Sequence, residues 1–242
     1  MSELHISISA QPIFVWGNYQ VTNTMLVTVL VTLFLSLLAI NAQRFLSRKH
    51  PPRWVLFLQT LVESFYEYVQ SITPRHAARF FPLVATLFLF ILFGNWAGLL
   101  PGAESIGLKT SHGFVPFLRG ATADINTTLA LAIFAVFSVQ FYGYKFRGLR
   151  YFTKFFDLSN PINFFVGFLE LISEFSKIMS FTFRLFGNIF AGEVLLAVIA
   201  FLVPLFASLP FLGLEIFVGL IQALVFSTLT LVFINIATAE HH

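Results

Sequence analysis

Five long apolar stretches are the feature of this sequence that most restricts its fold. A bilayer core about 30 Å thick is crossed by about 20 apolar residues in an α-helix. Stretches of at least about that length cover residues 22–43, 80–100, 123–144, 160–204 and 211–238. Hydrophobic residues make up 57% of the chain and charged residues only 10%, so there are too few charges to solvate a water-facing fold. We therefore predict an all-α polytopic membrane protein.

The sequence predicts one membrane domain, residues 1–242, without internal repeats or flexible linkers. Its parts are an N-terminal segment with the first span, an interfacial helix, two further spans and a C-terminal helical hairpin. These parts cover residues 1–53, 54–79, 80–154 and 155–242. The interfacial helix is expected because residues 54–72 carry polar side chains at helical spacing among apolar ones, which is typical of a helix lying along a membrane surface.

Two basic clusters set the expected orientation of the spans. One follows the first apolar stretch, and the other follows the third. Their residues are Arg44, Arg48, Lys49 and Arg53, and Lys145, Arg147, Arg150 and Lys154. Because Lys and Arg accumulate in cytoplasmic loops, both clusters are expected inside and the loop before residue 120 outside. Loop orientation thus explains the net charge of +3, and no nucleic acid is expected as a partner.

The fourth apolar stretch is too long for one upright crossing. It begins at Asn160 and Pro161, a pair typical of a helix start, and runs to Pro204. Its roughly 44 residues would span about 66 Å as a helix, which is twice the thickness of the membrane. The segment must therefore tilt steeply or break. A single crossing would place the C-terminus inside, and two crossings would place it outside.

Polar side chains within the last two stretches are the candidates for function. They are Glu170, Ser173, Glu174, Lys177, Arg184, Asn188 and Glu193 in the long stretch, and Glu215 and Gln222 in the last one. A charge at the centre of the membrane costs about 2.5 to 3.5 kcal/mol, so an ionisable residue there is a functional candidate unless a partner neutralises it. Arg184 has no carboxylate three or four positions away, so its own helix offers it no local partner.

Helical geometry divides the polar residues of the long stretch between two faces. At about 100° per residue, Ser173, Lys177 and Asn188 fall within about 40° of Arg184. Glu193 lies about 180° from Arg184 on the same helix. One helix therefore presents two polar faces.

An antiparallel hairpin that turns near Pro204 would bring two pairs of polar residues together. It would place Gln222 beside Arg184 and Glu215 beside Glu193. The two pairings are mutually consistent, because both imply the same centre for the turn. Each pairing also has a purely structural interpretation: Arg184 and Gln222 as a hydrogen-bonded clamp, and Glu193 and Glu215 as carboxyl groups that share a proton.

Two other polar groups also have structural alternatives. Glu170, Glu174 and Lys177 could form an ion-paired cluster near the membrane surface, because they lie three or four positions apart. Asp124 and Asn126 could cap the third span, since Asp and Asn favour helix starts.

Three motifs resemble a known family. The most specific is SFTFRLFGNIFAGE at residues 180–193, and the others are GNWAGLLPG at residues 94–102 and TADINTTLAL at residues 122–131. Together with the last helix, these motifs resemble subunit a of the F-type ATP synthases, the membrane stator and proton-channel subunit. The resemblance covers residues from 54 to the C-terminus, and before that only a first span.

The resemblance implies a fold, a mechanism and partners. The long segment would be one strongly tilted helix that forms a hairpin with the last helix, with the C-terminus inside. Arg184 would be the coupling arginine, with Asn188 and Gln222 as its polar neighbours. The chain would act on a carboxylate of the rotating c-subunit ring, and the other expected partners are the b subunits of the peripheral stalk, further ATP synthase subunits and membrane lipid.

The resemblance also implies two offset half-channels for protons. The outer one would contain Glu193, Asp124 and Asn126, and the inner one Glu170, Ser173 and Lys177. Glu215 departs from the family pattern, because relatives often have His there, although a carboxylate beside Glu193 could also relay protons. No family role corresponds to Glu174.

The sequence also bears on other classes of function. No Gly-rich loop ending in Gly-Lys-Ser or Gly-Lys-Thr is present, so we expect no nucleotide site or catalytic site in the chain itself. With no Cys, thiolate metal sites are excluded, and no metal or cofactor is expected. A secondary ion transporter or channel is the alternative, although we find no inverted repeat. The expected location is a bacterial plasma membrane, with a mitochondrial inner or thylakoid membrane as the alternative.

Overall fold

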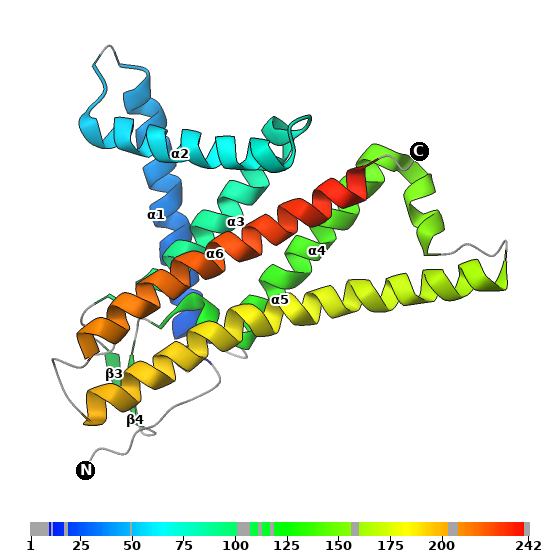
Figure 1. Ribbon diagram of the computed structural model, residues 1–242. Coiled ribbons are helices and arrows are strands. Elements are labelled where there is room, and N and C mark those ends of the chain that lie inside the picture. The colour runs from blue at the N-terminus through cyan, green and yellow to red at the C-terminus, as the bar shows by residue number, and fades with distance from the viewer. Residues whose placement is uncertain are drawn as a thin grey trace.

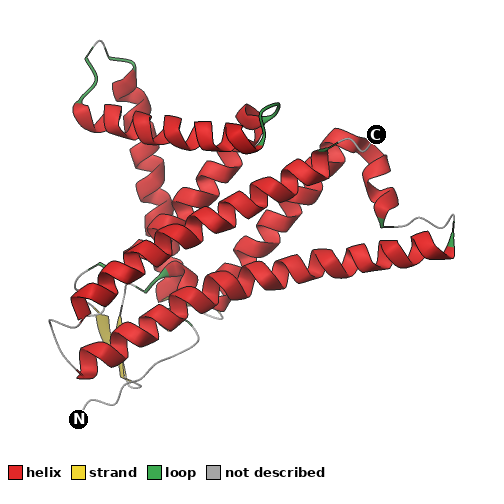
Figure 2. Ribbon diagram, in the orientation of Figure 1, coloured by secondary structure: helices red, strands yellow, loops and turns green. Residues whose placement is uncertain are grey.

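The computed structural model describes residues 10, 12–16, 19–48, 50–100, 107–110, 113–116, 119–155, 160–202 and 208–239. Six α-helices make up most of this part of the chain (Figures 1 and 2). They are α1 (Asn23–Leu46), α2 (Arg53–Ile72), α3 (Ala77–Gly98), α4 (Ile125–Arg147), α5 (Pro161–Leu202) and α6 (Ser208–Thr238). All but α2 are long and apolar enough to cross a membrane. The prediction of an all-α polytopic membrane protein is therefore confirmed.

Short elements connect the helices. Two antiparallel hairpins, β1 (Pro12–Trp16) with β2 (Tyr19–Thr22) and β3 (Gly107–Thr110) with β4 (Gly113–Pro116), precede α1 and follow α3. The 3₁₀ turns η1 (Ala121–Ala123) and η2 (Gly148–Lys154) flank α4. Helix α4 ends at Arg147 and is capped by Gly148, whose φ of +63° is a backbone conformation that favours glycine.

Helix α2 lies across the ends of α1 and α3, as expected for an interfacial helix (Figure 1). Val55 and Val69 are fully buried, whereas Trp54, Phe57 and Leu61 on the same helix are exposed. Apolar side chains that point away from the protein on such a helix are suited to insertion into the membrane surface.

Helix α5 is continuous over its 42 residues, so the long apolar stretch tilts rather than breaks. At 1.5 Å per residue it extends for about 63 Å. It begins at Pro161, as predicted, and Phe164 N–H donates to Asn160 O at 3.0 Å. In Figure 1, α5 and α6 run obliquely to α1 as a hairpin. The predicted turn at Pro204 lies outside the described residues.

Helix α6 begins earlier than predicted. Its first residue is Ser208, so Pro210 lies within the first turn and does not precede the helix. Proline is tolerated there because the first turn has no partner for its missing N–H group.

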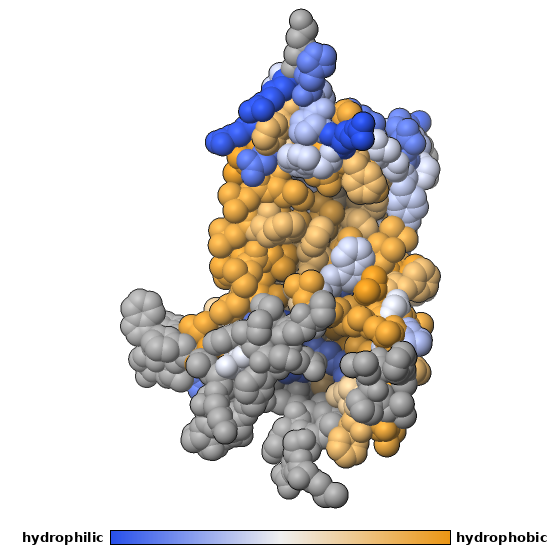
Figure 3. Space-filling model, turned by 90° about the vertical axis from the view of Figure 1, so that its left-hand side faces the viewer, coloured by the Kyte–Doolittle hydropathy of each residue, from blue (hydrophilic) through white to orange (hydrophobic). Residues whose placement is uncertain are grey.

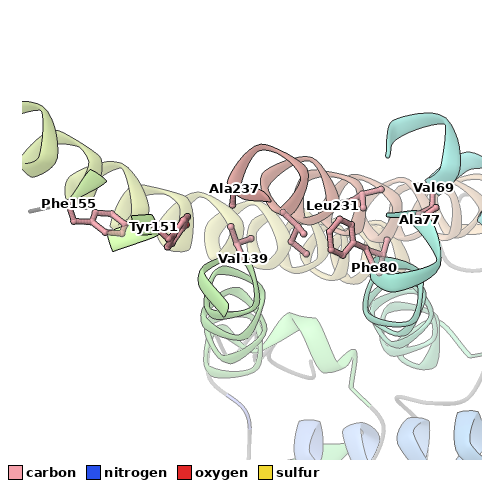
Figure 4. Close-up of a cluster of buried hydrophobic side chains, with 10 residues drawn as sticks. Val69, Ala77, Phe80, Val139, Tyr151, Phe155, Leu231 and Ala237 are labelled. Carbon is pink, nitrogen blue, oxygen red and sulfur yellow. The ribbon is translucent and has the colours of Figure 1, made fainter. Parts of the chain in front are cut away.

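The hydrophobic core lies where α6 crosses α3 and α4. Near one end, Phe80, Leu231 and Ile234 are fully buried, and Figure 4 shows Phe80 and Leu231 between the helices, close to Val69 of α2. Further along, Phe181 of α5 packs on Phe226 of α6 with ring centroids 4.8 Å apart. Alanines at 132, 135 and 223 are buried in this second cluster, and their small side chains let the helices approach closely.

The outer surface suits a lipid environment. Figure 3 shows a broad hydrophobic band with hydrophilic residues gathered at one end. Several phenylalanines are more than half exposed, among them Phe137, Phe165, Phe175 and Phe217.

The start of α3 meets the end of α4, where the Arg79 guanidinium lies 4.5 Å from the Phe146 ring. The ends of α1 and α4 that carry the two basic clusters therefore lie on the same side of the molecule (Figure 1).

Candidate functional site

Arg184 lies near the middle of α5, at the edge of the face that packs against the other helices. Phe181 and Leu185 are buried against this core, whereas Phe183 is 53% exposed. The Arg184 guanidinium donates through Nη2 to Ser180 Oγ at 3.3 Å, one turn earlier on the same helix. None of the ion pairs between described residues includes Arg184. Its charge thus borders the exposed surface.

The amide groups of Asn188 and Gln222 join α5 to α6. Asn188 Nδ2 donates to Gln222 Oε1 at 2.7 Å, and the Gln222 side chain is buried. Gln222 Nε2 is buried and has no hydrogen-bond acceptor among the described residues. Sequence reasoning predicted Arg184 as the neighbour of Gln222, and the residue that bonds to it is instead Asn188, one helical turn further on.

Glu193 is ion-paired with Arg119, the residue that precedes the short loop into η1. Arg119 Nε lies 3.2 Å from Glu193 Oε2, and their side chains are only 11% and 24% exposed. The neighbouring Gly120 is buried, and a Cβ built on it would lie 3.4 Å from Glu193 Oε1. Arg119 was not among the predicted site residues. The only feature of the sequence that could have indicated Arg119 was its positive charge, five positions before Asp124.

Glu215 of α6 is buried and packs directly on α5. Its side chain is 5% exposed, and its carboxyl group occupies the space that a side chain at Gly192 would fill. Gly192 immediately precedes Glu193, so Glu215 of α6 lies level with Glu193 along the hairpin, as predicted. The carboxylate of Glu193, however, is held by Arg119.

Asp124 caps α4, which was one of the two interpretations of this residue. Asp124 Oδ1 accepts from Asn126 N at 3.2 Å and from Asn126 Nδ2 at 3.3 Å. Thr24 of α1 also donates to Asp124 Oδ2 at 3.3 Å, and the Asp124 side chain is 5% exposed. Asn126 itself is exposed. The carboxylate therefore joins the starts of α1 and α4 as well as capping a helix.

Two side chains of the motif at residues 94–102 donate hydrogen bonds to α6 close to Glu215. Asn95 Nδ2 donates to Gly219 O at 3.1 Å, and Trp96 Nε1 donates to Ile216 O at 3.0 Å. The Thr122 hydroxyl of η1 donates to Asn95 Oδ1. Polar groups of α3 thus bind the part of α6 that carries Glu215, and η1 holds one of them, Asn95, in place.

Ion pairs connect the polar residues near the start of α5. Lys154 Nζ lies 3.2 Å from Glu170 Oε1 and 3.3 Å from Glu174 Oε1, and Lys177 Nζ lies 3.0 Å from Glu174 Oε1. The predicted ion-paired cluster is therefore present, with Lys154 of η2 as a further member. Ser173 is exposed and lies on the same helix.

Arg184 separates these two polar regions along α5. Glu170 lies 14 positions before it and Glu193 nine positions after it, which corresponds to about 21 Å and about 13 Å along the helix axis. No group of three His, Asp or Glu side chains that could hold a metal ion occurs in the described part of the chain. The chemistry available is that of one permanent cation between two sets of titratable groups.

Comparison with known proteins identifies the family. The sequence model of the family described as ATP synthase A chain matches residues 23–235. The chain belongs to this family. As an ATP synthase A chain, it is a multi-pass membrane subunit of the proton-translocating ATP synthase complex. This confirms the resemblance inferred from the motif around Arg184, and it disfavours the alternative of a secondary transporter.

Proposed function

We propose that the chain supplies two offset half-channels for protons, with Arg184 as a fixed positive charge between them. In this mechanism the chain drives protonation and deprotonation of a carboxylate on the rotating c-subunit ring. The observation that carries the proposal is the position of Arg184, which borders the exposed face of α5 between two polar regions and is joined to no carboxylate among the described residues.

The charge of Arg184 explains why protons must travel on the ring. A guanidinium stays protonated in proteins, so it opposes the direct passage of protons between the two regions. It also favours the ionised form of a nearby carboxylate. A ring carboxylate that reaches Arg184 therefore loses its proton to one path, and it takes a new one from the other path before it returns to lipid.

The exposed face around Arg184 suits a partner helix. Ser173, Ser180 and Ala191 lie within about 40° of Arg184 around α5, and all three are exposed and small. A Cβ built on Gly187, on the same side, would meet no heavy atom of the described chain within 4 Å. Small side chains allow helices to approach closely in membranes, so this face could admit a ring helix up to the guanidinium.

The outer half-channel is assigned to the region beyond Arg184. Glu193 and Glu215 are its titratable groups, and Asn188, Gln222, Asp124 and Asn126 are polar residues along it. The ion pair with Arg119 supports this assignment, because it fixes Glu193 at the junction of α5 and η1. The Asp124 carboxylate has a structural role there as well, because it accepts hydrogen bonds from the Thr24 hydroxyl and from Asn126 N.

The inner half-channel is assigned to Glu170, Ser173 and Lys177. The ion pairs of Lys154 and Lys177 with the two carboxylates support a polar entrance at this end of α5. Glu174 Oε1 is ion-paired with both lysines, which gives this residue a positioning role within the cluster.

The test is the loss of coupling in Arg184→Ala. The complete ATP synthase with this substitution should assemble but make no ATP in proteoliposomes under an imposed proton gradient, and its passive proton leak should rise. Arg184→Lys should restore synthesis poorly, because an ammonium lacks the planar fork of donors. Arg48→Ala, at the exposed end of α1, is the matched control for loss of one cation. Near wild-type synthesis by an assembled Arg184→Ala complex would contradict the proposal.

A further inference from the structure

A basic pocket lies between η2 and the first turns of α5. Its volume is about 300 Å³, and it opens to the surface. Arg147, Arg150 and Lys154 line one side, and Asn163 and Glu170 of α5 line the other. The pocket is therefore formed by the second basic cluster, at the end of the molecule that the distribution of Lys and Arg assigns to the cytoplasm.

The charges of this pocket are not balanced by the described residues. Lys154 is already engaged by Glu170 and Glu174, at 3.2 and 3.3 Å. Arg147 and Arg150 form no ion pair with any carboxylate in the described part of the chain. Two guanidinium groups on one pocket wall match the planar, bidentate recognition of phosphate oxygens.

The surroundings of the pocket are apolar. Ile162, Phe165 and Val166 at the start of α5 are 76%, 61% and 56% exposed, and Leu149 of η2 is 78% exposed. An inorganic phosphate ion would make no use of these side chains, whereas the acyl chains of a lipid would cover them. Anionic phospholipids are enriched in the cytoplasmic leaflet, and basic pockets between membrane helices on that side are suited to their head groups.

We propose that this pocket binds the phosphate of an anionic phospholipid head group. Arg147 and Arg150 hold the phosphate, Asn163 lies on the opposite wall, and the acyl chains lie along the exposed apolar side chains of α5. The pocket shares Glu170 with the inner half-channel proposed above, but Arg147 and Arg150, which hold the phosphate, are assigned no part in that channel or in the role of Arg184. Bound lipid would fix the connection between α4 and α5 at the point where Lys154 holds Glu170.

Photochemical labelling in the intact complex tests this site. The ATP synthase is reconstituted in phosphatidylcholine vesicles that contain a small fraction of phosphatidylglycerol with a diazirine in its acyl chain. Irradiation should label the peptide that contains residues 162–169. The double substitution Arg147→Ala and Arg150→Ala should lower this labelling by about thirtyfold, because each of the two cations near a lipid surface contributes about 1 kcal/mol and about 1.4 kcal/mol corresponds to a factor of ten. Replacement of the same two residues by Lys should retain most of it.

Three comparisons make the result decisive. Arg44→Ala with Arg48→Ala removes two cations from the other basic cluster and should leave the labelling of residues 162–169 unchanged. A diazirine phosphatidylcholine should label this peptide weakly, with no dependence on Arg147 and Arg150. An excess of inorganic phosphate should not compete with the lipid probe.

The opposite results would overturn the proposal. Labelling that does not depend on the two arginines would show only general contact with lipid. Full competition by inorganic phosphate would assign the pocket to a soluble anion.

Discussion

The carboxyl group of Glu215 on α6 fills the space beside Gly192 on α5 that any larger residue would occupy. This contact lies at the end of the hairpin near Glu193 and lets the two helices approach closely there. With a larger residue at position 192 the carboxyl group, which is the far end of a flexible side chain, would have to move, since even a single methyl group would overlap it.

Gly192→Ala should therefore displace the Glu215 side chain. The carboxyl group can move at little cost, because it is the end of a flexible side chain, so we expect little change in stability but slower proton uptake. Proton flux through the membrane domain, measured in vesicles with a pH-sensitive dye, checks the second effect. Gly213→Ala is the control, because nothing of the described chain lies within 4 Å of a Cβ at that position. Equal flux in both variants would show that the position of the Glu215 carboxyl group is unimportant.

Glu215 should act through its ability to exchange a proton. Glu215→Gln keeps the size and hydrogen bonding of the side chain but cannot titrate, so proton flux should fall while assembly is unchanged. Glu215→His restores a titratable group and should recover part of the flux. Unchanged flux in Glu215→Gln would leave the residue with a structural role alone.

Arg119 should hold Glu193 in place. Arg119→Ala removes one ion pair of a partly buried carboxylate, at a cost of about 1 to 3 kcal/mol in stability, and it should also shift the pH dependence of proton flux. Arg119→Lys retains the charge and should give an intermediate profile. A loss of stability with an unchanged pH profile would mean that the pair is structural only.

The open face around Arg184 should be sensitive to size. A Cβ at position 187 meets no described atom of its own chain within 4 Å, so the subunit with Gly187→Phe should still fold. If a ring helix approaches there, the added ring should block coupled ATP synthesis in the assembled complex. Gly213→Phe provides the control, since a Cβ at that position also meets no described atom within 4 Å. Normal synthesis by Gly187→Phe would place the partner elsewhere.

The orientation can be tested by labelling in intact cells or oriented vesicles. A Cys introduced at Ser111, in the segment between α3 and α4, should react with an impermeant thiol reagent added outside. A Cys at Ser47, which is exposed at the end of α1, should react only from inside. The chain has no native Cys, so no background labelling is expected. The reverse pattern would exchange the assignments of the two half-channels.

Much of the fold follows from the sequence alone, because a membrane restricts the choices of the chain. Backbone polar groups in lipid must be satisfied within each segment, so an apolar stretch of sufficient length forms a helix. The start of α5 at Pro161 and the capping role of Asp124 were also predictable, since both depend on local backbone chemistry. The motif around Arg184 was sufficient to indicate the family.

Only the tertiary structure decided which polar groups meet. The partners Arg119 and Glu193 are far apart in the sequence, as are Asn188 and Gln222, and Lys154 is separated from Glu174 by a helix start. Hydropathy and helical periodicity place a residue on a face of its own helix, but they do not fix how that helix is rotated and shifted against its neighbours. That arrangement depends on close contacts such as Glu215 on Gly192, where the absence of a side chain on one helix makes room for a carboxyl group from another.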